Sequence, residues 1–464
     1  MSMQVPRLRR LCSALFISLI AAACSEEVAT KPATRSFAPA PTLSRVAAAA
    51  EGRHVFVFNG KVPADFAAQV AKLGGSVVRS VPEINMFVTQ GLSDAAASSL
   101  GNPNEVGPDF DARWVPTPEE VQVSSVGLDA PVDAASVLPP QAAFFLPLQW
   151  NMRQIHAPEA WTGHTGIPSV RVAILDTGLD PDHLDQRGLI DKASSFAFVP
   201  STGGPPTWAD DQFHGTHVGG IVTSNNFGTA GVAPNVTLIA VKVLNAAGKG
   251  SFADIIAGII YATNVHANVI NMSLGATAPK QAHIGPLQAA LNKAVNYAHG
   301  HGTLVVSAAG NEDVDLQHGH DFISIPCEAG VQMCISATGP TDTKASYSNY
   351  GVNAINVAAP GGDFVPAPTS FVLSLCSSHT MDPAIIALGC RNRVTYLYVI
   401  GTSQAAPHVS GLAALLDSQY GGSLNPSQLI TRIEQNADDI GKPGVDAFYG
   451  KGRINAFRTV TDNP

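Results

Sequence analysis

Charged residues are scarce in this sequence. They make up 14% of the 464 residues, the formal net charge is −9, and no basic run is long enough to form a phosphate-binding surface. A nucleic-acid partner is therefore not expected. Turn-forming residues are plentiful by contrast, with 42 glycines and 33 prolines, and this composition favours many turns over a helical bundle.

Long hydrophobic runs are also lacking, and the apolar run near the N-terminus is short for a membrane span. This run, LCSALFISLIAAAC, covers Leu11–Cys24, follows three arginines and ends in small residues. A basic flank, a short apolar stretch and small residues together predict a secretory signal peptide at residues 1–23. An uncleaved membrane anchor is the alternative interpretation.

The end of the same run, LIAAAC, resembles a bacterial lipoprotein signal, in which Cys24 is lipidated and becomes the first mature residue. Ala21 stands where such signals usually carry a larger aliphatic residue, and AAA also suits an ordinary signal peptidase. Two locations therefore stay open. The protein is either secreted to the extracellular space or attached to the outer cell surface as a lipoprotein through Cys24.

Cysteine is rare, and only four of the six cysteines lie beyond the predicted signal and its edge. An even number of cysteines in an exported protein predicts two disulfides. Three pairings are possible, and we favour the local pairs Cys327–Cys334 and Cys376–Cys390 because each pair brackets a loop-like segment. A zinc site is the rival interpretation, but the spacings are too wide for CxxC motifs.

Composition divides the mature sequence into four segments. A Pro-, Ala- and Ser-rich stretch without periodicity predicts a flexible tether at 24–52. Residues 53–116 show strand and helix patterns in the order β-α-β-β-α-β, typical of a small α+β ferredoxin-like domain. A second Pro-flanked stretch, 117–147, predicts a linker, and 148–464 forms the largest domain.

The largest domain alternates apolar strands with helices. Helical spacing is clear at 251–264 and 285–300, and Gly300 is the expected C-terminal cap of the second helix. Near-continuous apolar strands separated by helices predict an α/β fold, in which a parallel sheet is flanked by helices on both faces. Functional sites in such sheets lie at the carboxyl ends of strands. The expected strands are Val170–Leu175, Val236–Leu244, Ala267–Ser273, Thr303–Gly310 and Ala354–Gly361.

Three polar residues stand at the ends of such elements. Asp176 directly follows an apolar strand, where an unpaired carboxylate is costly, although a turn aspartate before Thr-Gly is an alternative. His214 begins a small-residue helix with His217 one turn later, a pair that also suits a metal, although no HExxH motif is present. Ser403 begins a helical run as either a cap or a nucleophile. The order Asp, His, Ser is a known order of a catalytic triad.

Five blocks around these residues resemble those of the subtilisin-like serine proteases, the subtilase family, and occur in the family's order: ILDTGLD, HGTHVGGIV, INMSLG, VSAAGNED and GTSQAAPHVSG. The resemblance covers most of 150–460, and residues 53–116 resemble the family's inhibitory propeptide. It implies a subtilisin-like fold in which Ser403 is the nucleophile, His214 is the general base and Asp176 orients the imidazole.

The resemblance also implies the surroundings of the triad. Asn311 would donate a hydrogen bond to the oxyanion, although Gly-Asn is also a common turn pair. NMSLG and SAAG resemble the strands that line the P1 pocket, and AAGKGS resembles the edge segment that pairs with an extended substrate. The small apolar lining suggests a broad specificity. The expected substrate-binding residues are Gly248, Gly250, Ser251, Ser273, Leu274, Gly275, Ala308, Ala309 and Gly310.

The implied function is a secreted or surface-anchored serine endopeptidase that works through an acyl-enzyme and is made as an autoprocessed zymogen. Its expected partners are protein or peptide substrates and its own propeptide, which would act as inhibitor and chaperone and be removed by a cut in 117–147. We expect a monomer. No cofactor is required for the chemistry. Structural calcium stays open, because TSNNFGTAGVAP looks shorter than the calcium loop of many relatives while Asp185 matches an acidic ligand position.

Other functions remain to be distinguished from this one. DTG at 176–178 suggests an aspartic protease, but such enzymes need two carboxylates that share a proton, and no second motif of this kind occurs. A catalytically inactive surface binding module on the same scaffold is another alternative, although all four proposed site residues are present. Residues 53–116 are either a propeptide or only an accessory domain.

Overall fold

The computed structural model describes residues 52–102, 104–128, 137–279, 285–318 and 322–462. The predicted signal peptide and Cys24 lie outside these ranges. All the described residues belong to one unit, Ser36–Pro464.

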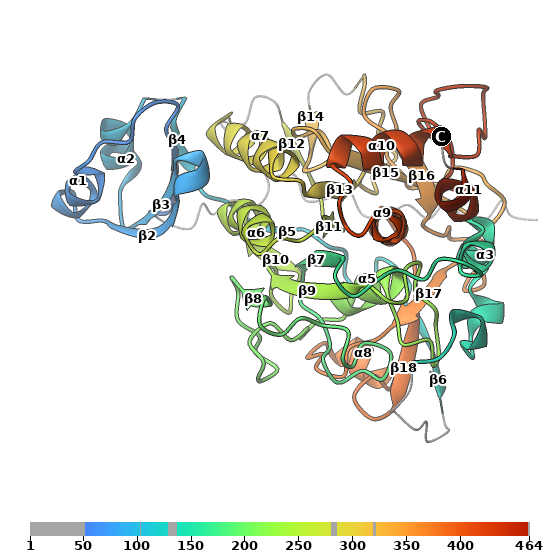
Figure 1. Ribbon diagram of the computed structural model, residues 1–464. Helices are drawn as coiled ribbons and strands as arrows, with labels where there is room; N and C mark the ends of the chain where they lie inside the picture. The colour runs from blue at the N-terminus through green and yellow to red at the C-terminus, as the bar shows by residue number, and fades with distance from the viewer. Residues whose placement is uncertain (1–51, 103, 129–136, 280–284, 319–321, 463–464) are drawn as a thin grey trace, which may run out of the picture. The chain divides into compact units, whose positions relative to one another are not determined.

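A seven-stranded sheet forms the centre of the large domain (Figure 1), and every neighbouring pair of its strands is parallel. Five of its strands overlap the predicted ones, whereas the sequence pattern did not predict β8 and β15. In spatial order the strands are β16 (Val357–Pro360), β15 (Met333–Thr338), β13 (Leu304–Ala308), β11 (Val269–Met272), β7 (Arg171–Asp176), β9 (Thr237–Lys242) and β8 (Phe196–Ala197).

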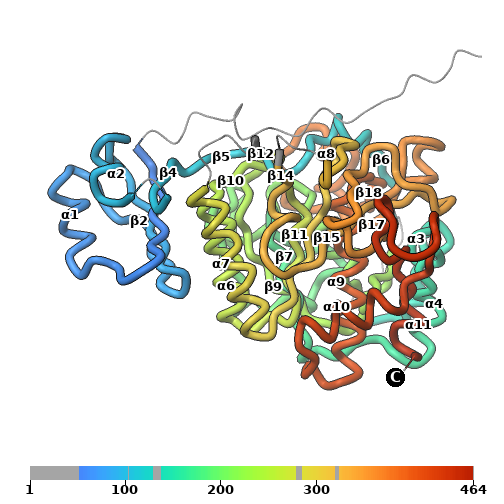
Figure 2. Tube along the Cα trace, turned by 90° about the horizontal axis from the view of Figure 1, so that it is seen from above, coloured from blue at the N-terminus to red at the C-terminus, as the bar shows by residue number. Residues whose placement is uncertain are grey.

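Helices cover both faces of this sheet, as the α/β pattern predicts. Figure 2 places α6 (Phe252–Asn264) and α7 (Gly285–Gly300) on one side of the strands and α9 (Thr402–Gln419) on the other. Helix α5 (His214–Val222) packs along α9. Alternate residues of β7 enter two separate cores: Val172 and Ile174 face the α5–α9 side, while Ala173 and Leu175 face the α6–α7 side.

The C-terminal cap of α7 differs from the prediction. The helix runs through Gly300, and the residue that adopts the left-handed conformation is Gly302, with φ of 85°. Gly302 lies within the turn that leads into β13, where a positive φ favours glycine.

A small antiparallel α+β domain precedes the large one, as its pattern predicts. Its sheet order is β2-β3-β1-β4, and Phe56, Phe58 and Phe66 pack together in its core. Ser93 caps the second helix by accepting a hydrogen bond from Ala96 N. In chain order the elements are β1 (His54–Val57), α1 (Phe66–Lys72), β2 (Ser76–Val81), η1 (Pro82–Ile84), β3 (Met86–Gln90), α2 (Asp94–Leu100) and β4 (Val106–Pro108).

The segment predicted to be a linker, 117–147, contains regular structure. Strand β6 (Ser124–Leu128) pairs antiparallel with β18 (Val394–Val399), which in turn pairs with β17 (Val372–Leu375). Two 3₁₀ turns follow, η2 (Pro140–Ala142) and η3 (Leu146–Leu148). Because β6 pairs with a strand about 270 residues away, local sequence pattern could not reveal it.

Both predicted disulfides are present. Cys327–Cys334 and Cys376–Cys390 join Cα atoms 5.0 and 5.7 Å apart. No helix among the described residues has both the length and the apolar character needed to cross a membrane. The remaining elements are β5 (Asp111–Arg113), α3 (Trp150–Gln154), α4 (Ala157–Ala160), β10 (Lys249–Ser251), β12 (Ala276–Pro279), β14 (Phe322–Ile325), α8 (Pro383–Ala387), α10 (Pro426–Gln435) and α11 (Ala456–Thr461).

Candidate active site

Asp176 and His214 form a buried hydrogen-bonded pair. Asp176 is the last residue of β7 and His214 is the first residue of α5. His214 Nδ1 lies 2.8 Å from Asp176 Oδ1 and 3.0 Å from Oδ2. Since an ionised carboxylate only accepts hydrogen bonds, Nδ1 carries the proton and the lone pair of the neutral ring is on Nε2. Nε2 is buried and has no hydrogen-bond partner among the described residues.

Two glycines allow the backbones that carry this pair to come together. Gly178 lies two residues after Asp176 and has a φ of 114°, a conformation that favours glycine. Gly215 follows His214, and a Cβ at this position would lie 2.1 Å from the carbonyl oxygen of Gly178. The DTG and HGT motifs therefore each contain the glycine that the close approach requires.

Ser403 lies near the beginning of the helix that packs along α5. It is the second residue of α9 and is almost fully buried. Its Oγ donates to the carbonyl oxygen of Ser273 at 2.9 Å, and Ser273 Oγ donates back to the Ser403 carbonyl at 2.7 Å. Within the described part of the chain no hydrogen bond joins Ser403 to His214. The structure thus places both residues at the N-termini of adjacent helices, with the serine hydroxyl bonded elsewhere.

The predicted oxyanion donor is oriented by the residue that precedes Ser403. Asn311 follows β13, and its Oδ1 accepts hydrogen bonds from both Thr402 N and Thr402 Oγ1, each at 2.9 Å. With the carbonyl oxygen occupied in this way, Nδ2 is the side-chain atom left to donate. Thr402 has no role in the sequence prediction, and its position next to Ser403 is the only signal for it.

The chain's own residues lie along the predicted substrate strands. Strand β5 pairs antiparallel with β10, which contains Gly250 and Ser251, and Gly248 directly precedes β10. Trp114 N then donates to Gly248 O at 2.9 Å, and Gly275 N donates to Trp114 O at 3.1 Å. Residues 111–114 therefore run between the predicted edge segment and Gly275, in the manner of an added strand.

The Trp114 side chain is buried in this arrangement. Its Nε1 donates to Gly250 O at 2.8 Å, and its ring centroid lies 5.4 Å from that of Phe252. Leu274, one of the predicted substrate-binding residues, belongs to the same buried apolar cluster.

Four other predicted substrate-binding residues, Ser251, Ala308, Ala309 and Gly310, are held within the fold. Ser251 Oγ accepts from Asp254 N as the cap of α6 and donates to Asp109 Oδ2 at 2.7 Å. Ala309 is buried, and its N–H donates to Ile335 O. Ala308 lies at the end of β13 and Gly310 follows with a φ of 103°.

A groove of about 470 Å³ adjoins this region. Its lining includes Arg113, residues 116–119, Gln212, Ala246, Ala247 and Lys249. Met381, Asp382 and Pro383 complete the wall. These last three belong to the loop closed by Cys376–Cys390, which the sequence prediction did not include in the site.

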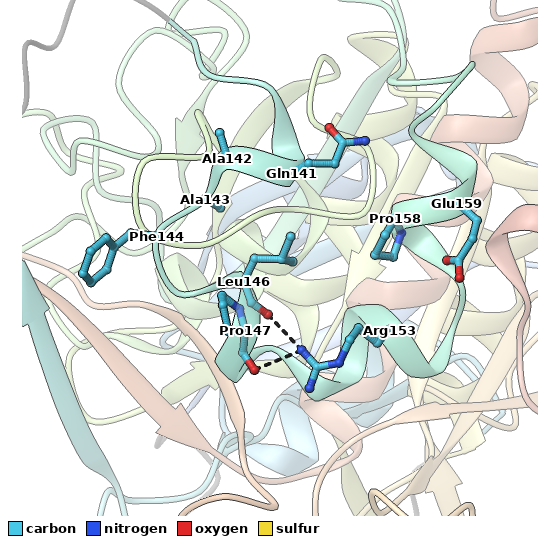
Figure 3. Close-up of a pocket in the computed structure, with 9 residues that line it drawn as sticks. All are labelled: Gln141, Ala142, Ala143, Phe144, Leu146, Pro147, Arg153, Pro158 and Glu159. Atoms are coloured by element: carbon cyan, nitrogen blue, oxygen red, sulfur yellow. Dashed lines mark hydrogen bonds between the residues drawn. The ribbon is translucent and has the colours of Figure 1, made fainter.

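A second pocket, of about 580 Å³, contains none of the predicted site residues (Figure 3). It lies between residues 141–147 and helices α3 and α4, where Arg153 Nη1 donates to the carbonyl oxygens of Leu146 and Pro147. None of the predicted catalytic residues therefore lines this pocket.

The surroundings of Asp185 do not suit a cation. Its carboxylate accepts hydrogen bonds from Phe227 N at 2.6 Å, Gly228 N at 2.9 Å and Tyr396 Oη at 2.8 Å. Burial, together with the neighbouring Asp185 charge, raises the pKa of Tyr396, so this hydroxyl stays protonated and donates. Thr229 N is a fourth donor at 3.3 Å, so the number of donors matches the lone-pair positions of a carboxylate, and the predicted ligand position belongs to a hydrogen-bonded anion.

Another group of side chains could hold a metal ion. Ligand atoms of Asp180, Asp182 and His379 all lie within 4.8 Å of one another, and His379 Nε2 is 2.8 Å from Asp182 Oδ2. His217 takes no part in a metal group among the described residues. Its Nε2 bonds to Leu397 O at 3.0 Å, and burial lowers the pKa of His217 to about 3, so the ring is neutral.

A parallel sheet that presents Asp176, His214 and Ser403 near its carboxyl edge is typical of α/β serine hydrolases. Comparison with known proteins then gives the family. Residues 168–452 match the Subtilase family, and the chain belongs to it as a subtilisin-like serine protease.

Relatives support this assignment over most of the chain. Thermitase from Thermoactinomyces vulgaris is 34% identical over 325 residues, covering 69% of this chain and 99% of thermitase. Subtilisin Savinase from Lederbergia lenta is 35% identical over 312 residues, covering 66% of this chain and 96% of that protein.

Solved structures resemble the chain as well. A lanthipeptide protease aligns with a TM-score of 0.60 and 27% identity, over 71% of this chain and 98% of its own. The epidermin leader peptide processing serine protease of Staphylococcus aureus aligns with a TM-score of 0.68 over 89% of this chain and 99% of its own. At 22% identity the second match shows the fold alone, and it extends over the small N-terminal domain.

Gly215→Ala tests the close approach of the two backbones. The added Cβ would meet a backbone oxygen at 2.1 Å, so His214 must move away from Asp176. We expect kcat/KM on a peptide substrate to fall about 100-fold or more, since misplacement by 1 Å has effects of this size. Gly219→Ala is the matched control on the same helix, because the nearest atoms to its Cβ would be side-chain ends, those of Gln186, Leu179 and Leu238, and not backbone. Equal kcat/KM for the two variants would contradict the prediction.

Proposed function

We propose that this chain is an exported serine endopeptidase that hydrolyses peptide bonds with Ser403, His214 and Asp176 and is made as a self-processing zymogen. The observation that carries the proposal is the 2.8 Å bond from His214 Nδ1 to Asp176, which leaves a buried Nε2 with a lone pair and no described partner. This is the state that a general base needs before it accepts a proton.

The proposed reaction begins when Ser403 Oγ turns from the Ser273 carbonyl to His214 Nε2. Catalytic hydrogen bonds often form only with substrate present. Nε2 takes the hydroxyl proton as Oγ attacks the peptide carbonyl carbon. Asn311 Nδ2 and the backbone N–H of Ser403, near the N-terminus of α9, donate to the oxyanion. Collapse of the tetrahedral intermediate breaks the C–N bond, and the leaving amine takes the proton from Nε2.

Hydrolysis of the acyl-enzyme repeats these steps with water. His214 takes a proton from the water molecule that attacks the ester carbonyl, and then returns it to Ser403 Oγ. Asp176 stays ionised throughout and stabilises the imidazolium. Substrates would add a strand beside β10, and because that contact uses backbone atoms the specificity is expected to be broad, with some preference for apolar P1 residues.

We propose that the small domain inhibits the enzyme until the chain is cut within 117–147. Residues 111–114 lie where a substrate strand would add. The anchor of this segment is Asp109, which is buried and accepts from Arg53 Nε at 2.6 Å, Ser251 Oγ at 2.7 Å and Ala253 N at 3.1 Å. Two of these donors lie at the N-terminus of α6, where a carboxylate is favoured.

The experiment that tests the proposed function compares wild type, Ser403→Ala and Asn311→Ala. Ser403→Ala should be inactive and remain uncut, because it lacks the nucleophile. Asn311→Ala should keep its fold and lose about 10²- to 10³-fold in kcat, the loss known for removal of this donor in this family of proteases. N-terminal sequencing with intact mass measures self-cleavage and would also detect a lipid on Cys24. Normal turnover by Ser403→Ala would refute the proposal.

Asp109→Asn should release the inhibition early. Loss of the charge weakens three hydrogen bonds to a buried carboxylate, and bonds to charged groups contribute about 1.5–3 kcal/mol each. We expect more activity per cleaved chain early in a maturation time course. Asp94→Asn is the control, because Asp94 is exposed and its side chain bonds, among the described residues, to His54 of the same small domain. An unchanged time course for Asp109→Asn would contradict the inhibitory role.

We propose that Asp180, Asp182 and His379 bind a structural divalent cation. Two carboxylates suit calcium, whereas the imidazole nitrogen favours Mn²⁺ or Zn²⁺. Asp180 is buried. Its Oδ1 accepts from Asp182 N and His183 N and its Oδ2 from Ser378 N, which fixes the carboxylate in place and, with one donor fewer than at Asp185, leaves a lone-pair position on Oδ2 for a cation.

Chelation tests this site. Treatment with EDTA should lower the Tm by several degrees and one of the three cations should restore it, because a ligand at 100 times its Kd adds about 2.7 kcal/mol. Asp182→Asn should abolish the restoration while Asp94→Asn should not. A Tm that no cation changes would rule the site out.

A further inference from the structure

A lysine ammonium is buried beside the Asp176–His214 pair. Lys242 is the last residue of β9, and in the sheet register its partner on β7 is Asp176. The side chain is fully buried. Its Nζ donates to Thr177 O at 2.5 Å, Asp211 Oδ1 at 2.6 Å and Leu244 O at 2.8 Å. These three bonds use every donor that an ammonium group has.

The three acceptors belong to the segments that build the active site. Thr177 is the residue after Asp176, and Asp211 lies three residues before His214. Leu244 lies on the path from β9 to β10, the predicted substrate edge. One ammonium group therefore joins the turn that follows the aspartate to the turn that precedes the histidine.

Asp211 is itself held firmly. Its Oδ2 accepts from Thr202 N at 2.7 Å and Thr202 Oγ1 at 2.9 Å. Its side chain, like that of Lys242, is almost without exposure. A buried ion pair is weak support for stability, since apolar residues of similar volume often serve the fold as well or better. One position earlier in the register of the same two strands, the pair consists of apolar residues, Leu175 on β7 and Val241 on β9. Stability of the sheet is therefore not a sufficient reason for charged residues at this position.

Several charged or titratable groups surround the imidazole. Asp176 bonds to it, and the buried Asp210 lies four residues before it and accepts from Thr216 N and Thr216 Oγ1. His217 is neutral, as described above. Lys242 and Asp211 contribute one charge of each sign, so removal of either one changes the net charge near His214.

We propose that Lys242 is a positioning residue for the catalytic pair: it fixes Asp176 and His214 at hydrogen-bonding distance through Thr177 and Asp211, and its charge balances that of Asp211. The proposal rests on the roles of Asp176 and His214 proposed above.

The test uses Lys242→Met, Asp211→Asn and the double variant, each made as the full chain and assayed after maturation. The readout is the pH dependence of kcat/KM, whose acid limb reports protonation of His214. Lys242→Met removes a positive charge, favours the imidazolium and should move the acid limb to higher pH. Asp211→Asn removes a negative charge and should move it to lower pH.

The double variant separates charge from position. Its net charge equals that of the wild type, so its acid limb should return close to the wild-type pH. Its kcat should nevertheless stay about 10- to 100-fold low, because the bonds to Thr177 and Leu244 are gone. This variant also leaves no buried charge unpaired, which guards against misfolding of Lys242→Met. Titration with an active-site phosphonate gives the folded fraction.

Lys344→Met is the matched control. Lys344 Nζ also bonds to one carboxylate, that of Asp313, and to two carbonyl oxygens, those of Ala345 and Ser348. It should lower stability without moving the acid limb. Acid limbs that coincide for wild type, Lys242→Met and Asp211→Asn would overturn the proposal. A wild type that the phosphonate does not label would instead refute the proposed function.

Discussion

The hydrogen bond between His214 Nδ1 and Asp176 is the interaction on which the rest of this structure depends. It decides which ring nitrogen keeps the lone pair, and it exists only because two chain segments approach with almost no space between them. Asp176 lies at the carboxyl end of its strand, and Gly178 and Gly215 permit the close approach of the two segments. Lys242 bonds to the turn after Asp176, at Thr177, and to the turn before His214, at Asp211. Two buried pairs thus lie next to each other, Asp176 with His214 and Lys242 with Asp211, and in each pair the buried charge has a hydrogen-bonded partner.

The sequence predicted those helices and strands whose pattern of apolar residues is visible within the segment itself. Strand β7 is an apolar run that ends in Asp176, and α6 and α7 have clear helical spacing, so the α/β fold and the position of the aspartate followed directly. Strand β15 was missed because Cys334 and Ser336 interrupt its apolar pattern. Strand β6 was missed because its partner β18 is distant in sequence and prolines flank its segment.

The contacts of individual side chains could be predicted from the sequence less well. Lys242 is the only charged residue in VTLIAVKVL, and its presence indicates that this end of β9 does more than pack in the core. The local sequence does not reveal that its partners are Thr177 and Asp211. Asp185 illustrates the opposite error, since its position in the sequence suggested a metal ligand. The groups around it decide the matter: three backbone N–H groups and a tyrosine hydroxyl point hydrogens at the carboxylate, where a cation would need lone pairs.

An edge strand that binds peptides through backbone atoms can also bind a segment of its own chain. Backbone N–H and C=O groups are the same in every peptide, so an edge such as β10 cannot exclude the chain that carries it. Residues 111–114 occupy that edge, and Trp114 fills the apolar space beside Phe252 with a bond from its indole to Gly250. A protease with a permissive edge is therefore exposed to its own chain as soon as it folds. If the triad acts as proposed, release then depends on contacts outside the edge, and among these is the buried carboxylate of Asp109 at the N-terminus of α6.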